Sequence, residues 1–414
     1  MATPLARIGA CWMLTLAILT LLSTGCTATR RDAVPPALTD KAQVPGYAGR
    51  IRYFPRDSGD VESLKQDLLD AYAREQAYLR MPGGAGPLPP AAFLAISGGG
   101  DDGAFGAGFL NGWTKAGTRP QFKLVTGIST GALIAPFAFL GPAYDDKLKW
   151  LYTSISFRDV AAQRSILSVL FDDALADNTP LWNLIRKNIT QDVLDAIAAE
   201  HAKGRILLVG TTNLDARRPV IWNLTKIAAS GRPGALQLFQ ALLVASAAMP
   251  GTFPPVMIDV EANQQSFQEM HVDGGTVAQV FVYPVAIHLK ELAEEHGIQR
   301  SRKLYIIRNA RLDPEWAQVD RRVLPIALRA ISSLIQYQGI GDLYRIYTVA
   351  RRDDVEFNLA FIPASFNTPH NTDFDTAYMR KLFDLAYGMA AAGYSWYKEP
   401  PVLLSGDELP PEPR

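Results

Sequence analysis

Residues 122–131 read Phe-Lys-Leu-Val-Thr-Gly-Ile-Ser-Thr-Gly, and this stretch decides which kind of fold the chain can adopt. Its first half is a short run of apolar and β-prone residues, which is typical of a buried strand. Its second half, Gly127–Gly131, precedes a small apolar run that suits a helix. A serine on a tight strand-to-helix turn needs a glycine on each side, and the turn lifts its hydroxyl above the sheet. Ser129 is therefore a candidate nucleophile.

Further apolar runs of strand length alternate with helical patterns along the chain; they cover residues 91–97, 205–210, 219–223 and 303–308. This alternation predicts an α/β protein with a mostly parallel sheet and helices on its faces. An amphipathic helix is expected over residues 60–81. Residues after about 311 look mainly helical, with long periods over 322–350 and 376–398.

A second glycine-rich motif follows the run at 91–97 and reads Gly-Gly-Gly-Asp-Asp-Gly-Ala-Phe-Gly-Ala-Gly over residues 98–108. Glycine amides can surround a developing oxyanion because no Cβ blocks the approach. Gly98, Gly99 and Gly100 are therefore candidate donors. The same letters also satisfy G-x-G-x-x-G, the pattern of a dinucleotide-binding loop. Two carboxylates in this loop would repel a pyrophosphate, which argues against that alternative.

A third motif, His-Val-Asp-Gly-Gly over residues 271–275, places a carboxylate on a turn after a short strand. Such a carboxylate can face the nucleophile. Asp-Gly is also common turn chemistry, so this motif means little alone and gains its value from the other two.

Together the three motifs resemble those of the patatin-like phospholipase family, in the family's order and over residues 91–309. The segment 245–255, Ala-Ser-Ala-Ala-Met-Pro-Gly-Thr-Phe-Pro-Pro, is also similar to the family's sequence between serine and aspartate. The resemblance implies a three-layer α/β/α fold and a Ser–Asp dyad. By position, Ser129 matches the nucleophile, Asp273 matches its partner, and Gly98–Gly100 match the oxyanion loop, to which the amide of Thr130 would add a donor.

Two residues depart from the family pattern. Asp102 stands near the place of a basic residue in the glycine loop, and Ser97 replaces an acid that often precedes the glycines. A missing cation would weaken the contact with an anionic lipid. The amide donors themselves would be unaffected.

A catalytic triad is the alternative to the dyad, and it would need a histidine after the acid in the chain. The chain has five histidines. His370, in a loop rich in Pro and Asn, is the best candidate, whereas His288 and His296 belong to a charged helix. His271 lies two residues before Asp273 and cannot easily bridge that residue to Ser129. The dyad is the favoured reading.

The N-terminus reads as a secretory signal, with Arg7 before an uncharged apolar run over residues 8–22 and small residues after it. The alternative is an uncleaved anchor helix. Residues 22–26, Leu-Ser-Thr-Gly-Cys, resemble a bacterial lipobox, whose cysteine becomes diacylated. Cys26 would then anchor the protein to a membrane through its acyl chains. The resemblance implies an outer-membrane lipoprotein of the bacterial cell envelope, because Thr27 rather than Asp follows the cysteine.

The patterns divide the chain into five expected segments. They are a signal peptide (1–25), a tether with an amphipathic helix (26–88), a patatin-like catalytic domain (89–310), a helical C-terminal extension (311–400) and a Pro-rich tail (401–414).

Composition narrows the class of function. The 414 residues include 41 acidic and 41 basic side chains and are 48% hydrophobic, which is the profile of a globular protein with a sizeable core. A nucleic-acid binder would need a basic surplus, so nucleic acid is not an expected partner. No spacing of histidine, cysteine and carboxylate residues suggests a metal site, and no cofactor is expected.

The expected function is hydrolysis of a carboxylic ester in a lipid, of the phospholipase A or lysophospholipase type, through an acyl-enzyme on Ser129. The competing hypothesis is a catalytically silent, lipid-binding envelope lipoprotein that keeps the fold. Asp102 in the glycine loop is its best support.

Overall fold

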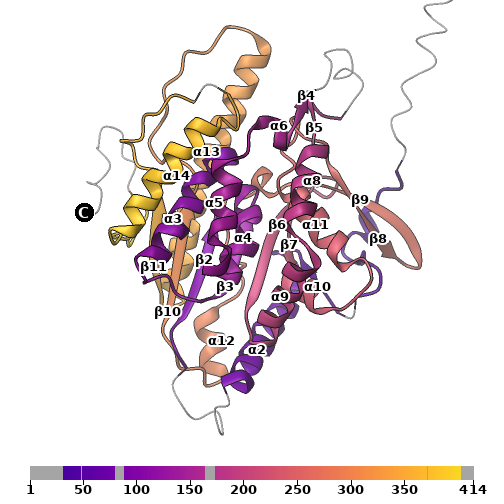
Figure 1. Cartoon of the computed structure of the whole chain (residues 1–414). Coiled ribbons are helices and arrows are strands. Elements are labelled where there is room, and N and C mark those ends of the chain that lie inside the picture. The colour runs from indigo at the N-terminus through magenta and orange to yellow at the C-terminus, as the bar shows by residue number, and fades with distance from the viewer. Residues whose placement is uncertain (1–30, 48, 80–87, 164–172, 371, 402–414) are drawn as a thin grey trace, which may run out of the picture.

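The computed structural model describes residues 31–47, 49–79, 88–163, 173–370 and 372–401. Its centre is a sheet with the strand order β1-β7-β6-β3-β2-β10-β11, in which β9 also pairs with β6 and β8 with β9 (Figure 1). The strands of this sheet are β1 (Arg52–Tyr53), β2 (Ala91–Ile96), β3 (Phe122–Ile128), β6 (Ile206–Asn213), β7 (Arg218–Asn223), β8 (Val256–Ala262), β9 (Gln265–Asp273), β10 (Arg302–Arg308) and β11 (Val355–Phe361). A separate short ribbon pairs β4 (Ala162–Gln163) with β5 (Ala176–Asp177).

The sheet is mixed and mostly parallel, as predicted. Strands β6, β3, β2, β10 and β11 run parallel to one another. Strands β1 and β7, and the hairpin of β8 and β9, add antiparallel pairs. Parallel strands end at one edge of a sheet, and ligands of α/β proteins bind outside that edge. The segments after β2, β3 and β10 therefore meet there.

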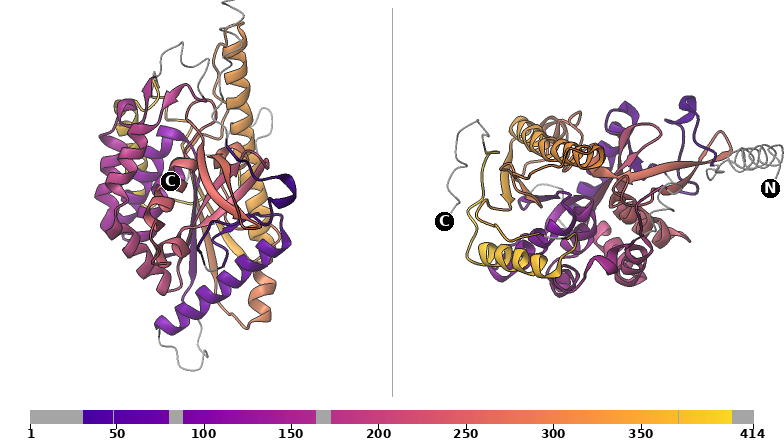
Figure 2. Two further views of the ribbon diagram at one scale, coloured as in Figure 1. Left: turned by 90° about the vertical axis from the view of Figure 1, so that its right-hand side faces the viewer. Right: turned by 90° about the horizontal axis from the view of Figure 1, so that it is seen from above.

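Helices cover both faces of the sheet, so the fold has the three layers that the sequence led us to expect (Figure 2). One face carries α3 (Gly103–Lys115), α4 (Thr130–Leu140), α5 (Asp145–Thr153), α6 (Phe157–Val160), α8 (Thr179–Asn188), α9 (Gln191–Ala202), α10 (Leu224–Ala229), α11 (Ala235–Ser246) and α14 (Thr376–Ala391). The other face carries α2 (Ser58–Leu79), α12 (Leu289–Glu295) and α13 (Val323–Arg352). Each face has its own cluster of buried apolar side chains.

The region expected to be a helical C-terminal extension also contributes a strand. Strand β11 lies between α13 and α14 and pairs with β10 along its whole length, from Arg302 opposite Val355 to Arg308 opposite Phe361. Helix α14 then packs on α3. A Cβ on Gly108 would lie 2.2 Å from the Phe383 carbonyl oxygen, so the two helix backbones are almost in contact.

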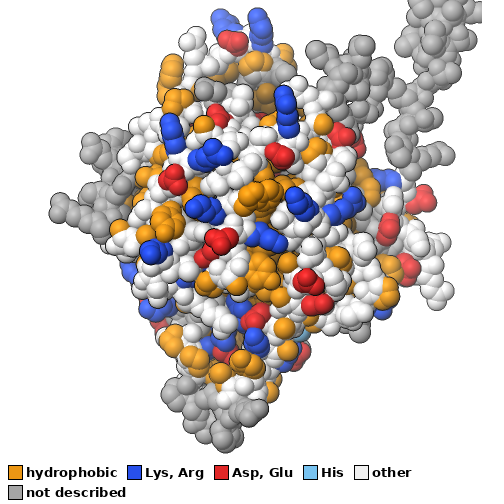
Figure 3. Space-filling view, viewed as in Figure 1, with side chains coloured by type: hydrophobic (Ala, Val, Ile, Leu, Met, Phe, Trp, Pro, Cys, Tyr) orange, Lys and Arg blue, Asp and Glu red, His pale blue; other side chains and the backbone are white. Residues whose placement is uncertain are grey.

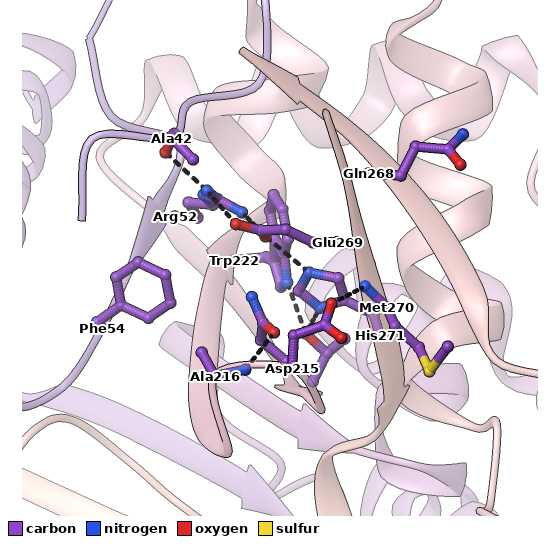
Figure 4. Close-up of polar contacts among 12 residues, drawn as sticks. Ala42, Arg52, Phe54, Asp215, Ala216, Trp222, Gln268, Glu269, Met270 and His271 are labelled. Carbon is purple, nitrogen blue, oxygen red and sulfur yellow. Dashed lines mark hydrogen bonds and ion pairs between the residues drawn. The ribbon is translucent and has the colours of Figure 1, made fainter. Parts of the chain in front are cut away.

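The segment expected to be a tether is in part a piece of the core. Residues 52–53 form β1 against β7, and Ile51, Tyr53 and Phe54 are buried. Arg52 is also buried, because its guanidinium pairs with the carboxylate of Glu269 and donates to the Ala42 carbonyl (Figure 4). The apolar residues at 51, 53 and 54 explain why this segment leaves the solvent. Residues 1–30, including the predicted signal peptide and Cys26, lie outside the described residues, as do residues 402–414.

The face of the molecule that is viewed in Figure 3 shows no broad area of a single charge. Lys and Arg side chains are interspersed with Asp and Glu across it (Figure 3). None of the helices in the described part of the chain combines the length and the apolar character needed to span a bilayer.

Candidate active site

Ser129 sits on a strained turn between β3 and α4. Its φ of 54° and ψ of −127° are unusual for a residue with a side chain, and such strain concentrates at functional sites. Both flanking glycines are required by close contacts. A Cβ on Gly127 would lie 2.4 Å from the Gly131 carbonyl oxygen, and one on Gly131 would lie 2.2 Å from that of Ile96.

The turn is braced from the neighbouring strand and helix. The Ser129 amide donates to the hydroxyl of Ser246 at 3.0 Å. That hydroxyl in turn donates to the Gly210 carbonyl oxygen in β6 at 2.7 Å. Ser246 lies in the segment 245–255 that resembles the family, but no sequence pattern predicted a role for it.

Asp273 ends β9 and points to the same turn. Its backbone amide donates to the Ala248 carbonyl oxygen at 2.9 Å, and its carboxylate accepts the amide of Gly275 at 2.7 Å. The side chain also interacts with that of Ser129, which lowers the pKa of Asp273. Burial raises the pKa of Asp273 to about 6, and the interactions with Ser129 and Gly275 only partly offset this effect. A carboxylate with such a pKa is a stronger base than an exposed one and is still ionised at neutral pH.

The glycine loop lies beside Ser129, but its three glycines are not equivalent. The Gly98 amide donates to the Gln279 carbonyl oxygen at 3.0 Å, so it is not free to bind an oxyanion, and its predicted role is corrected. Gly98 also packs closely, since a Cβ there would lie 3.2 Å from that of Ser129. Gly100 has a φ of 60° and lines the pocket, whereas Gly99 does not line it. Within the described residues, no acceptor is found for the amides of Gly99 and Gly100.

A pocket of about 250 Å³ brings four of the predicted site residues together. Ser129, Thr130, Gly100 and Asp273 line its polar end. The rest is largely apolar and includes Leu133, Phe137, Leu151, Phe157, Val160 and Leu181. An apolar cavity with a few convergent polar groups is the usual form of a small-molecule site.

Thr130 is fixed at the start of α4. Its hydroxyl lies 2.6 Å from that of Tyr152, and burial raises the pKa of this tyrosine. The amide of Thr130 is in the first turn of the helix, where no intrahelical acceptor exists.

His271 is turned away from the pocket. Its Nδ1 lies 2.9 Å from the Thr211 hydroxyl and its Nε2 lies 3.1 Å from the Glu269 carboxylate (Figure 4). The ring is fully buried, and this burial lowers the pKa of His271. The whole imidazole is therefore engaged in a polar cluster that also holds Arg52 and Trp222.

His370, the best triad candidate, is engaged elsewhere as well. Its Nε2 lies 2.7 Å from the Asp101 carboxylate, and its ring stacks on Tyr378 at 4.4 Å between centroids. Among the described residues that line the pocket there is no histidine.

The two acids of the glycine loop point in different directions. Asp101 lines the pocket and also accepts the Phe374 amide at 2.7 Å. Asp102 is not part of the lining; it accepts the hydroxyl of Tyr378 in α14 at 2.5 Å, and burial raises its pKa to about 7. The departure at residue 102 therefore does not place a carboxylate in the pocket.

Asn309, directly after β10, holds the two ends of the glycine loop by hydrogen bonds. Its side-chain amide donates to the Ser97 carbonyl oxygen at 2.9 Å, and its side-chain oxygen accepts the Gly106 amide at 2.9 Å. The Ser97 hydroxyl accepts the backbone amide of Asn309 at 2.8 Å. No sequence pattern predicted a role for Asn309. The available signal was its position just after a strand, since parallel strands end at the edge of the sheet where the candidate site lies.

In the part of the chain that the structure describes, no group of three His, Cys, Asp or Glu residues is arranged to hold a metal ion. The polar side chains in the pocket lining are those of Ser129, Thr130, Tyr152, Asn188 and Thr252, together with the carboxylates of Asp101, Asp273 and Asp373.

A serine on a strand–helix elbow, beside a glycine loop and a buried carboxylate, is the arrangement of a serine hydrolase. Residues 94–286 match the family model of the patatin-like phospholipases, a family of lipid acyl hydrolases, so this part of the chain is patatin-like. The resemblance found in the sequence is confirmed.

Solved structures with similarity to the chain include VipD from Legionella pneumophila, at 12% identity over 73% of this chain and 67% of that one, with a TM-score of 0.34. Human GIVD cytosolic phospholipase A2 matches at 10% identity over 70% of this chain and 52% of that one, with a TM-score of 0.28. This chain thus spans about half the length of the human protein. No curated protein matches the chain.

Proposed function

We propose that this protein hydrolyses the carboxylic esters of phospholipids or lysophospholipids by means of a Ser129–Asp273 dyad. The observation that carries the proposal is that Ser129 and Asp273 line the same largely apolar pocket, with their side chains close enough for Ser129 to lower the pKa of Asp273. The elevated pKa of Asp273 supports its role as the base.

In the first half of the reaction, Asp273 takes the proton of the Ser129 hydroxyl while the serine oxygen attacks the ester carbonyl carbon. The oxyanion that forms is held by backbone amides, for which Gly100 and Thr130 are the best placed because both line the pocket. Loss of one such donor typically raises the barrier by about 3 kcal/mol. Asp273 then gives its proton to the leaving alcohol, and the acyl group stays on Ser129.

In the second half, Asp273 takes a proton from water, and the resulting hydroxide attacks the acyl carbonyl. Collapse of this second intermediate releases the fatty acid and returns the proton to Ser129. The apolar walls would hold the acyl chain and exclude bulk water, which strengthens every electrostatic contact within the site.

Activity-based labelling gives the first test. A fluorophosphonate should label the natural chain and leave Ser129→Ala unlabelled, and a screen of phospholipid and lysophospholipid classes should show fatty acid release only with the natural chain. Labelling of the variant, or equal release by both proteins, would show that Ser129 is not the nucleophile. A folded natural chain that neither labels nor hydrolyses any lipid would support the silent, lipid-binding alternative.

We also propose that Cys26 carries lipid and holds the protein at the membrane of the cell envelope, as an outer-membrane lipoprotein. The proposal rests on the lipobox-like residues 22–26 after the apolar run. It would bring the pocket close to its lipid substrate.

A further inference from the structure

A second, larger hollow lies on the opposite face of the sheet from the Ser129 pocket. This groove has a volume of about 890 Å³ and runs between α13, the segment 277–288 and the strands β6 and β7. Ligand pockets commonly measure about 300–1,000 Å³, so the groove is large enough for a lipid-sized molecule.

The groove combines an apolar floor with several positively charged side chains. Five arginines line it, namely Arg56, Arg217, Arg218, Arg345 and Arg352. Among the described residues that line it, no Asp or Glu is present. The balanced charge of the whole chain makes this local excess conspicuous.

Two of these arginines are free to bind a ligand. Arg218 pairs with Asp40, Arg345 with Asp342 and Arg352 with Asp353. For Arg56 and Arg217, no carboxylate partner is present in the ranges that the structure describes. The positive charge of Arg56 also helps to lower the pKa of Arg345, after the larger effect of burial, so these two guanidinium groups repel each other. An anion between them would relieve that repulsion.

The floor of the groove adjoins the proposed dyad. Ile128 and Gly274 line the groove, and each is the chain neighbour of a dyad residue. Gly210 lies between them, since a Cβ on Gly274 would lie 2.5 Å from the Gly210 carbonyl oxygen. A ligand in the groove would therefore rest on the back of the strands that carry Ser129 and Asp273.

We propose that this groove is a second lipid site, which binds a long-chain fatty acid with its carboxylate at the arginine rim and its chain along the apolar floor. A cationic or zwitterionic head group would leave its positive charge without a partner here. A carboxylate gains charge-assisted hydrogen bonds to guanidinium groups. The proposal does not depend on hydrolysis at Ser129, because it concerns equilibrium binding on the other face of the sheet.

The experiment measures binding of cis-parinaric acid, a fluorescent fatty acid, to the full chain, and its displacement by oleate and by oleyl alcohol. The double variant Arg56→Glu/Arg217→Glu should bind at least tenfold more weakly. Ala286→Trp, which places bulk at the exposed edge of the groove, should also weaken binding. Arg321→Glu, an exposed arginine outside the groove, is the matched control and should bind as the natural chain does.

Oleate should displace the probe at least tenfold better than oleyl alcohol, which has the same chain without the charge. All variants are checked by circular dichroism and thermal unfolding, so that a loss of fold is not mistaken for a loss of binding. Unchanged binding in both groove variants would overturn the proposal and assign the probe to the Ser129 pocket. Equal displacement by the alcohol, or no binding by the natural chain, would overturn it as well.

Discussion

Replacing Asp273 by Asn should make the protein more stable while abolishing its activity. Burial raises the pKa of this carboxyl from 3.8 to about 6. A pKa difference of this size corresponds to about 3 kcal/mol. At high pH, the ionised carboxylate lowers the free energy of unfolding by this amount. Asn keeps the shape and can still accept the Gly275 amide, but it carries no charge. We therefore expect Asp273→Asn to raise the free energy of unfolding by up to about 3 kcal/mol near pH 8.

The increase in the free energy of unfolding that Asp273→Asn causes should become larger as the pH rises. Because the folded pKa of Asp273 lies above the unfolded value, its ionisation costs nothing below pH 3.8. The cost then grows as the pH rises through about 6 and stays constant above that. The stabilisation by Asn should follow the same curve. In the natural chain, kcat/KM should rise through the same range, since only the ionised carboxylate can take the serine proton.

The assay is urea unfolding followed by tryptophan fluorescence at several pH values between 4 and 8, together with hydrolysis of a short-chain nitrophenyl ester. Asp384→Asn, at an exposed position on α14, serves as the control and should leave stability and turnover nearly unchanged at every pH. The argument from burial would be refuted if Asp273→Asn were less stable than the natural chain at pH 8. It would also be refuted if the change in the free energy of unfolding were the same at all pH values. Turnover close to that of the natural chain would refute the dyad.

Three further outcomes follow from the structure and the sequence. Gly131→Ala should prevent folding or labelling by fluorophosphonate, because its Cβ would overlap the Ile96 carbonyl oxygen; a soluble, fully labelled variant would contradict this. Arg52→Ala should lower the free energy of unfolding by about 3–5 kcal/mol, since it leaves the buried Glu269 carboxylate without its cation, and an unchanged melting temperature would argue against a buried pair. Cys26→Ser should move the protein from the detergent phase to the aqueous phase; a variant that stays on membranes after a salt wash would favour an uncleaved anchor.

The sequence predicted the centre of the sheet better than its edges. The runs that became β2, β3, β6 and β10 are continuous and apolar because these strands are buried on both faces, and such runs are easy to find. Strand β11 was missed because it lies between two long helical patterns. Strand β1 has only two residues, and its place in the sheet depends on the distant pair of Arg52 with Glu269, which no local pattern reveals.

The candidate site was predictable where backbone geometry requires a particular residue. The glycines around Ser129 are such positions, and so is the Asp-Gly-Gly turn. What each amide does was not predictable, because the partner of Gly98 is the carbonyl of Gln279, 181 positions further along the chain. The same holds for the histidines. Only the fold shows that His271 and His370 have carboxylate partners of their own.

The close contact between α3 and α14 bears on how short a working piece of this chain can be. The match to the family ends at residue 286, which invites a truncation after β10. Such a piece would lack the carbonyl oxygens of Phe383 and Tyr387 that lie against the glycines of α3, and the Tyr378 hydroxyl that donates to Asp102. Helix α3 begins directly after the glycine loop that lies beside Ser129. The last helix is therefore a structural support of the proposed active site, and anyone shortening the chain should cut after residue 391 rather than before 376.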